Sequence, residues 1–297
     1  MGALSTVALV HFSCFRSLWI PVIKKIPGGA FLEIALTQLA NNMMPNKFGT
    51  TCKNIFNLRV PIIYNGKNYL IVNKAVGIFC QPPDLREWHK AQREDPPVLL
   101  DILRENSGIC NVQELRTVHR LDSRVTGGVL IAKNKNSAVQ FAKNLKKGGN
   151  FGFAFTRKYV ALVSGTPKEP VSEQGIICKD GMITQYKRIK ENCLVVQLHT
   201  GKKHQIRKHL AQVLGQPLLN DLKYGGKQIF GAGDQIALHS AFIKTKIGLQ
   251  VNEHLIPVPS SGTALWSECL GSDGHFDTLI QNTLLENWKE EIKKCEQ

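Results

Sequence analysis

The chain has 297 residues, of which 43% are hydrophobic and 21% are charged, a balance that excludes a disordered chain or a small disulfide-stapled protein. Its 38 Lys and Arg residues exceed its 23 acidic residues, which gives a formal net charge of +15 and a pI near 9.5. Residues 120–208 alone carry 18 basic and five acidic side chains. A folded stretch with most of the net charge favours a polyanionic partner, and nucleic acid ahead of a membrane surface. A basic protein without such a partner is the alternative.

Residues 1–50 differ in composition from the rest of the chain. Glu33 is the only acidic residue there, and Ser, Thr and apolar residues separate four basic ones. This acid-poor pattern is typical of a mitochondrial presequence, so we predict mitochondrial localisation, with cytoplasm or nucleus as the alternative. Two other interpretations stay open: a signal anchor over residues 3–23, or alternative translation starts at Met43 and Met44. No other segment is apolar enough to span a membrane, and we predict no membrane partner.

The remainder, residues 55–297, is predicted to form a single folded domain. Two β-rich runs at 59–64 and 69–73 flank Asn65-Gly66, which is a hairpin signal. Prolines and charges predict an irregular loop over 81–97. The other expected elements are helices at 98–106, 136–145, 203–214 and 276–294 and strands at 129–133, 158–164, 194–198, 235–244 and 247–251. Strands outnumber helices without regular alternation, so we predict an α+β fold with a mixed, largely antiparallel sheet and flanking helices.

The sequence gives little support for metal or nucleotide chemistry. None of the eight cysteines forms a C-x-x-C pair, and no His pair has zinc-finger spacing, so we predict no metal site and reduced thiols, several of them in the core. No G-x-G-x-x-G is present. Gly225-Gly226-Lys227 is followed by Gln rather than Ser or Thr, which argues against a phosphate-binding loop of the NTPase kind.

One candidate site for chemistry is Asp122, which lies close in sequence to Arg120, Arg124 and Lys133 and precedes a glycine turn and an apolar strand. Nearby cations favour the carboxylate form of an aspartate. An ionised aspartate in a loop before a strand can act as a nucleophile or a base. From spacing alone, this interpretation and a surface ion pair are equally supported.

A second segment, residues 199–210, reads H-T-G-K-K-H-Q-I-R-K-H-L. It places basic and polar residues at a glycine turn that leads into a helix, and both helix N-termini and basic side chains bind phosphate. His204 and His209 are five residues apart, which is poor spacing for one metal on one helical face. Structural histidines are therefore favoured over metal ligands.

Together the two segments resemble the signatures of the RluA-type RNA pseudouridine synthases. The family's H-R-L-D, followed by T-S-G, corresponds to His119–Asp122 and Thr126–Gly128, and its T-G-R-x-H-Q-I-R-x-H-L corresponds to Thr200–Leu210. Four further stretches resemble family patterns in the same order: 70–77, 158–163, 215–225 and 238–240. T-G-G at 126–128 and Gly148-Gly149-Asn150 also resemble the fungal mitochondrial large-subunit rRNA branch.

This resemblance implies the pseudouridine synthase fold and an isomerase that detaches uracil from C1′, rotates it and rejoins it through C5. It implies that Asp122 is the nucleophile, that Tyr159 stacks on the base and helps to remove the C5 proton, and that Arg207 pairs with Asp122. No cofactor is implied. The expected partner is structured RNA, rRNA rather than tRNA, bound by a monomer. The expected RNA-binding residues are His119, Arg120, Arg124, Lys202, Lys203, His204 and Gln205.

Three positions depart from the family pattern: Gly127 replaces the usual Ser, Ala75 the usual Pro and Lys202 the usual Arg. The change at Lys202 affects an expected RNA contact more than catalysis. A non-catalytic RNA-binding or ribosome-assembly factor on the same fold is the alternative function. A DNA-binding protein would need an exposed recognition helix, for which no pattern is present. Whether Asp122 attacks the base or the ribose is left open.

Overall fold

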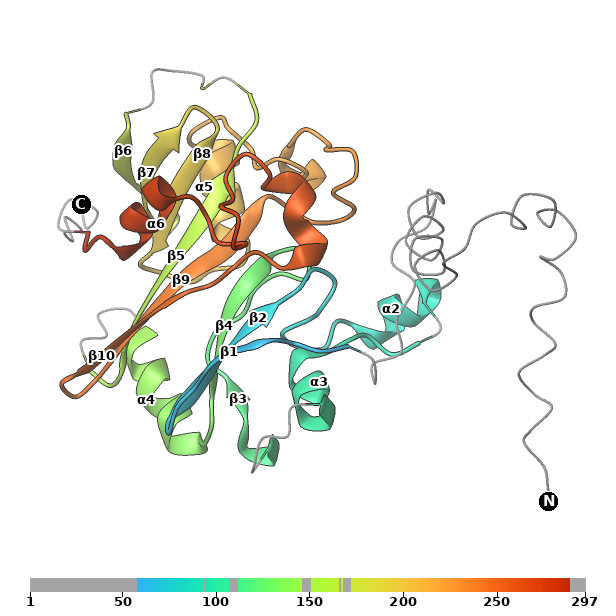
Figure 1. The fold of residues 1–297 in the computed structure, drawn as a ribbon. Helices are drawn as coiled ribbons and strands as arrows, with labels where there is room; N and C mark the ends of the chain where they lie inside the picture. The colour runs from blue at the N-terminus through green and yellow to red at the C-terminus, as the bar shows by residue number, and fades with distance from the viewer. Residues whose placement is uncertain are drawn as a thin grey trace, which may run out of the picture. The chain divides into compact units, whose positions relative to one another are not determined.

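The computed structural model describes residues 58–92, 94–106, 112–145, 151–165, 167 and 172–288 (Figure 1). The extension predicted at residues 1–50 lies outside them, and the domain boundary near residue 55 stays a prediction. The strands are Ile62–Asn65 (β1), Tyr69–Lys74 (β2), Arg116–Thr117 (β3), Thr126–Ala132 (β4), Ala154–Leu162 (β5), Gln174–Lys179 (β6), Met182–Lys190 (β7), Cys193–Leu198 (β8), Leu238–Ile247 (β9) and Gln250–Leu255 (β10). The α-helices are Leu85–Ala91 (α2), Leu99–Asn106 (α3), Lys135–Leu145 (α4), Gln205–Gln212 (α5) and Thr278–Leu285 (α6), and short 3-10 helices span Val112–Glu114 (η3), Leu222–Tyr224 (η4) and Ser260–Leu265 (η5).

One ten-stranded sheet organises these elements, in the order β1-β2-β4-β9-β5-β8-β7-β6, with β10 beside β9 and β3 beside β4. Its strand pairs are antiparallel except for β4 and β9, which run parallel at Thr126–His239 and Gly127–Ser240. Helix α5 packs against β7, α4 against β4 and β5, and α6 against β8, β9 and β10 (Figure 1). The predicted α+β fold, with a mixed and largely antiparallel sheet, is confirmed.

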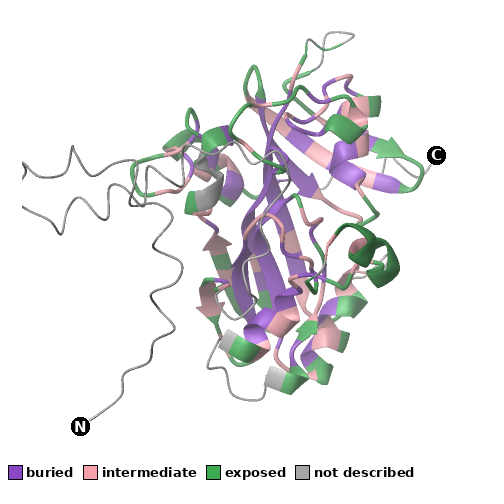
Figure 2. Ribbon diagram, turned by 90° about the vertical axis from the view of Figure 1, so that its right-hand side faces the viewer, coloured by how far each residue is buried: buried purple, intermediate pink, exposed green. Residues whose placement is uncertain are grey.

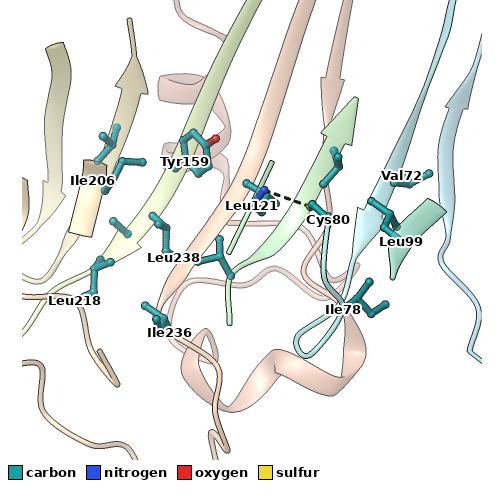
Figure 3. Packing of buried hydrophobic residues seen from close by; sticks show 14 of the residues in the cluster. Val72, Ile78, Cys80, Leu99, Leu121, Tyr159, Ile206, Leu218, Ile236 and Leu238 are labelled. Atoms are coloured by element: carbon teal, nitrogen blue, oxygen red, sulfur yellow. Dashed lines mark hydrogen bonds between the residues drawn. The ribbon is translucent and has the colours of Figure 1, made fainter. Parts of the chain in front are cut away.

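The middle of the sheet is buried along its length (Figure 2). Every residue of β2 and of β4 is buried, and so is most of β5. Burial of one Val, Leu or Ile side chain contributes about 1.5–3 kcal/mol, so these strands give the sheet a rigid centre. One hydrophobic cluster reaches from Val72 and Leu99 to Tyr159 and Leu218 (Figure 3). It lies under the segment that carries Asp122.

Two sequence predictions for local structure are wrong. The proline-rich stretch predicted as a loop contains helix α2, because Asp84 caps its start by accepting hydrogen bonds from the backbone of Arg86 and Glu87. Strands β6 and β7 were not predicted at all. They form a hairpin through Asp180-Gly181, where both residues have positive φ values of 52° and 65°. Asp-Gly between two β-rich runs is a strong hairpin signal that the sequence did carry.

The other predicted helices and strands occur with the expected type but different bounds, whereas β3 and the 3-10 helices η3, η4 and η5 were not predicted. Strand β5 begins at Ala154 rather than at 158, and α6 ends at Leu285, while residues 289–297 lie outside the described part. Cys80, Cys193 and Cys269 are free and buried, as predicted. Among the described residues, no helix is both long and apolar enough to cross a membrane.

Candidate active site

Asp122 lies in a short loop that enters β4, and its neighbours fix that loop on both sides. Leu121 is buried, and its backbone N–H donates to the Cys80 Sγ at 3.3 Å (Figure 3). The Ser123 carbonyl accepts from the backbone N–H of Gly77 at 2.8 Å, and the Asp122 carbonyl accepts from that of Val125 at 3.0 Å. The Asp122 carboxylate therefore projects from a backbone with little freedom, and its side chain is 25% exposed.

A buried lysine adds a further tie to this loop. The Lys74 Nζ donates hydrogen bonds to the carbonyls of Ala75 at 2.9 Å, Ile78 at 3.0 Å and Ser123 at 3.3 Å. Burial lowers the pKa of Lys74 to about 8, while Cys80 and Asp122 oppose that shift. Lys74 thus joins the end of β2 to the residue that follows Asp122.

Glycine 127 explains one departure from the family pattern. It has a φ of +109°, and a Cβ at this position would lie 2.5 Å from the backbone oxygen of Ser240 and 2.6 Å from its nitrogen. The parallel pairing of β4 and β9 places Gly127 directly beside Ser240, so the two backbones lie close together here. In this chain, the position where the family has Ser accepts only Gly.

Arg207, near the start of α5, connects two carboxylates. Its Nη1 donates to Asp122 Oδ2 at 2.9 Å, its Nε to Asp221 Oδ2 at 2.7 Å and its Nη2 to Asp221 Oδ1 at 2.8 Å. The Asp221 side chain is 1% exposed. The bidentate pair with Asp221 fixes the plane of the guanidinium, which then holds one oxygen of Asp122. No hydrogen bond to Asp122 Oδ1 occurs among the described residues, so this oxygen is open for chemistry.

His204 and Tyr224 complete this side of the site. The His204 Nε2 lies 3.6 Å from Asp122 Oδ2, and its Nδ1 is 2.9 Å from the Tyr224 hydroxyl. The Tyr224 ring lies under the Arg207 guanidinium, 5.0 Å from its carbon. Burial lowers the pKa of His204 below 6.5 although Asp122 opposes the shift, so the imidazole is neutral at pH 7.

Tyr159 provides the facing wall. It lies on β5, is 3% exposed and belongs to the central hydrophobic cluster (Figure 3). Burial raises the pKa of its phenol, so the group is neutral at pH 7. A neutral ring held by the core offers a rigid stacking surface and a phenol hydrogen bond, but not a phenolate base.

Asp122, Tyr159 and Arg207 line one open cavity of about 540 Å³. The structure therefore brings together the three residues predicted for catalysis. Six of the seven predicted RNA-binding residues line the same cavity: His119, Arg120, Lys202, Lys203, His204 and Gln205. The seventh, Arg124, is exposed and lines a neighbouring cavity of about 380 Å³ that also contacts Asp122 and Arg207.

Two of these predicted RNA contacts have structural roles. His119 is buried, and its Nε2 accepts a hydrogen bond from the backbone of Leu130 at 3.0 Å. Burial, and secondarily Arg157, lowers its pKa well below 6.5, so the ring is neutral. Gln205 is buried and uses its amide to hold Thr200 and the backbone of Lys202 against β7. An RNA contact for either residue stays a prediction.

The sequence signatures did not assign roles to Lys74, Arg157, Asp221 or Tyr224. Asp221 and Tyr224 lie within the 215–225 stretch that resembles the family, so a signal for them was present. Lys74 lies within the 70–77 stretch, so a signal was present for it as well, whereas Arg157 lies one residue before the 158–163 stretch. Among the described residues, no cluster of three or more His, Cys, Asp or Glu side chains could hold a metal ion.

The arrangement brings a carboxylate, the guanidinium that holds it and an aromatic ring to one open cavity. Residues 68–212 match the sequence profile of the RNA pseudouridylate synthase family. A Kluyveromyces lactis protein named 21S rRNA pseudouridine(2819) synthase is 44% identical over 267 residues, which cover 88% of this chain and 89% of that protein. The chain belongs to the RNA pseudouridine synthase family, and the predicted family and isomerase activity are confirmed.

Two other relatives carry the same name. The Eremothecium gossypii protein is 49% identical over 228 residues, which cover 76% of this chain and 87% of that protein. The Saccharomyces cerevisiae protein is 47% identical over 247 residues, which cover 77% of this chain and 97% of that protein. In each case the similarity extends over most of both chains.

Proposed function

We propose that this RNA pseudouridine synthase isomerises a specific uridine in the large-subunit rRNA of mitochondria, with Asp122 as its nucleophile. The observation that carries the assignment of Asp122 is its 2.9 Å hydrogen bond from Arg207 inside a cavity that Tyr159 also lines. The proposed substrate rests on three relatives at 44–49% identity, each named as a 21S rRNA pseudouridine synthase.

In the proposed reaction, each of the three residues has a distinct task. Arg207 holds Oδ2 of Asp122, which leaves Oδ1 to attack the target nucleotide, at either the base or the ribose. As uracil leaves C1′, the ring of Tyr159 stacks against it and keeps it in the cavity while it rotates. The bond from C1′ to C5 then forms and the bond between the nucleotide and the Asp122 carboxylate breaks, which frees the carboxylate. C5 gives up its proton to solvent and N1, which has lost its bond to C1′, takes one up, so the product is an isomer of uridine.

The target uridine must leave its stack in the RNA before Asp122 can reach it. The exposed side chains of Arg120, Lys202 and Lys203 at the cavity rim suit the RNA backbone around such a flipped nucleotide. The Arg120 guanidinium is held by Gln81 at 2.6 Å, and the Lys202 Nζ by the Asp180 carbonyl at 2.6 Å. Binding that uses these cations should weaken as salt is raised.

The decisive test of the chemistry is Asp122→Asn, which keeps the shape of the side chain and removes its nucleophilic oxygen. Conversion of uridine to pseudouridine in a 21S rRNA fragment around position 2819 should fall below detection, while binding to that fragment persists. Asp234→Asn is the matched control, because Asp234 is exposed and its side chain has no hydrogen bond or ion pair among the described residues. Full activity of Asp122→Asn would show that Asp122 is not the nucleophile. RNA binding without any conversion by the wild-type protein would instead favour the non-catalytic alternative.

The proposed mitochondrial location and monomeric state need separate measurements. The acid-poor residues 1–50 and the names of the relatives support import into mitochondria. A carboxy-terminal fluorescent fusion should therefore co-localise with mitochondria, and removal of residues 1–50 should abolish this. Pseudouridine mapping of mitochondrial and cytosolic RNA, with and without the gene, identifies the target. Light scattering of the purified protein tests for a monomer.

A further inference from the structure

We propose that Arg157 binds a phosphate of the RNA backbone that enters the catalytic cavity with the target nucleotide. This inference rests on the proposed function, because it assumes that RNA is the substrate of this cavity. It adds a binding residue that the sequence signatures did not indicate.

Four Lys and Arg side chains are buried in the described part of the chain, and three of them are fully engaged. Lys74 donates to three backbone carbonyls, and Arg207 donates to two carboxylates. Lys158 donates to the carbonyls of Thr283, Leu284 and Glu286 at the end of α6. Buried charges in proteins are paired or bound in this way, because an unpaired buried ion is costly.

Arg157 is the exception among these four. It is 6% exposed, its Nε is buried without a partner, and neither terminal nitrogen makes a hydrogen bond to a described residue. The described acidic side chains form no salt bridge with it. Its guanidinium lies over the Phe155 ring, 5.2 Å from the ring centre. That contact orients the cation but gives none of its five N–H donors a hydrogen-bond acceptor from the described residues.

The terminal nitrogens of Arg157 lie in the wall of the catalytic cavity. They come within 3.7 and 3.8 Å of the point where a Cβ of Gly201 would lie. Because Gly201 has no side chain, nothing from that residue covers the guanidinium. Arg157 also shares its strand face with Tyr159, two residues along β5, so both side chains meet the same nucleotide.

An RNA nucleotide offers one anion, its phosphate, and the fork of an arginine matches phosphate oxygens in a bidentate manner. Uracil is neutral and would leave the buried charge uncompensated. The exposed Lys203 follows Gly201 by two residues, at the turn that leads into α5, and adds positive potential to the same wall. A phosphate over Gly201 would therefore lie beside the Arg157 guanidinium and the Gly201 backbone. Asp122 is the one acidic residue among the described residues that line this cavity.

The first experiment measures affinity for RNA in the Asp122→Asn background, so that no turnover interferes. The probes are the 21S rRNA fragment around position 2819 and a short oligouridylate. Arg157→Gln should weaken binding to the 21S fragment about tenfold to a hundredfold, as expected for lost hydrogen bonds to a charged group. On the single-stranded probe, the slope of log Kd against log salt should fall by about 0.7. Lys246→Gln removes one exposed cation on β9 and should leave affinity close to that of the parent.

A second experiment identifies the phosphate. Single methylphosphonate substitutions, which remove one backbone charge each, are introduced along the 21S fragment. One of them, next to the target uridine, should weaken binding to the parent protein by the same factor as Arg157→Gln. The same substitution should cause no further loss in Arg157→Gln. If every methylphosphonate weakens both proteins equally, Arg157 binds no phosphate and the inference is overturned.

A measurement of stability against denaturant distinguishes phosphate binding by Arg157 from a purely structural role of this residue. Because Arg157 makes no hydrogen bond or ion pair with a described residue, and Met keeps an apolar chain over the Phe155 ring, Arg157→Met should unfold at a denaturant concentration equal to or above that of the parent. A marked loss of stability, with affinity lost only through unfolding, would overturn the inference. Failure of the wild-type protein to modify the 21S fragment would contradict the proposed substrate. The slope of log Kd against log salt for the oligouridylate tests Arg157 independently of that substrate.

Discussion

Asp221 holds the guanidinium of Arg207 through two hydrogen bonds, at 2.7 and 2.8 Å, and leaves the third nitrogen of the guanidinium to Asp122, the proposed nucleophile. Asp221 is buried and does not line either cavity around Asp122, so it acts on the reaction only through Arg207. It is a positioning residue. Three charged groups are thus linked in series, and the buried Asp221 orients Arg207, which in turn orients the carboxylate of Asp122.

The first prediction concerns Asp221→Asn, which replaces one acceptor oxygen by an amide donor. The guanidinium then turns away from its present plane, and the carboxylate of Asp122 loses its fixed direction. We expect kcat to fall about 100-fold, the cost of a misplaced reactive group, with KM nearly unchanged. Steady-state kinetics on the 21S fragment measure both. Asp234→Asn serves as the matched control, and an unchanged kcat in Asp221→Asn would show that Arg207 does not need this partner.

The second prediction concerns Lys74→Met, which keeps the volume of the side chain and removes three hydrogen bonds. The carbonyls of Ala75, Ile78 and Ser123 lose a buried donor, at a cost of about 1–3 kcal/mol for each that stays unsatisfied. We expect a lower free energy of unfolding together with a lower kcat, because Ser123 follows the nucleophile directly. Chemical denaturation and single-turnover rates measure the two effects.

The exposed Lys246 provides the comparison for this prediction. Lys246→Met removes a lysine from β9 and should change neither stability nor rate. If Lys74→Met loses stability but keeps the wild-type rate at a temperature where it is fully folded, Lys74 supports the sheet and not the position of Asp122.

That the three residues proposed for catalysis lie at one cavity was predictable, because short, ordered signatures carry them. The loop around Asp122 and the start of α5 are each short, continuous segments. Their motifs can therefore be recognised in the sequence without knowledge of the tertiary structure. Arg157 was not predictable in the same way, because the adjacent Lys158 equally fits the basic residue that precedes Tyr159 in the family pattern. Alternation along a strand puts residues 157 and 159 on one face and 158 on the other, where it meets α6. Which of two adjacent cations faces the cavity depends on register, which neighbouring strands set.

Fold class was predictable from the excess of strands, but strand order was not. The parallel contact between β4 and β9 joins residues more than a hundred positions apart, and local pattern says nothing about such a pairing. The same contact explains the glycine at 127. From sequence alone it was only a departure from the family pattern, since its backbone neighbour, Ser240, comes from a distant strand.

The third prediction restores the family residue at that position. Gly127→Ser would force a Cβ to within 2.5 Å of the backbone oxygen of Ser240 and strain a φ of +109°. We expect the free energy of unfolding to fall by more than about 3 kcal/mol, since both overpacking and backbone strain contribute. Because the clash is with backbone atoms, adding Ser240→Ala should not rescue the variant. Rescue would mean that the hydroxyl of Ser240, and not its backbone, limits this position.

The fourth prediction is a pH dependence of stability from Lys158. Burial, with Lys187 and Lys244 nearby, lowers the pKa of Lys158 to about 8 from an ordinary value of 10.5. Below pH 8 the side chain is protonated in both the folded and the unfolded chain. Between pH 8 and 10.5 the folded chain releases this proton while the unfolded chain keeps it. The unfolded state then binds more protons, so the free energy of unfolding should rise with pH across this window.

Lys74 has a pKa of about 8 for the same reason of burial, so the two lysines contribute in the same direction. Lys158→Met should therefore reduce the rise between pH 8 and 10 without abolishing it, and Lys246→Met should leave it unchanged. Urea denaturation at several pH values gives the slope for each protein. A Lys158→Met protein whose stability rises as steeply as the wild type would mean that the three carbonyls at the end of α6, and the Trp288 ring 4.5 Å away, hold the ammonium well enough to offset burial.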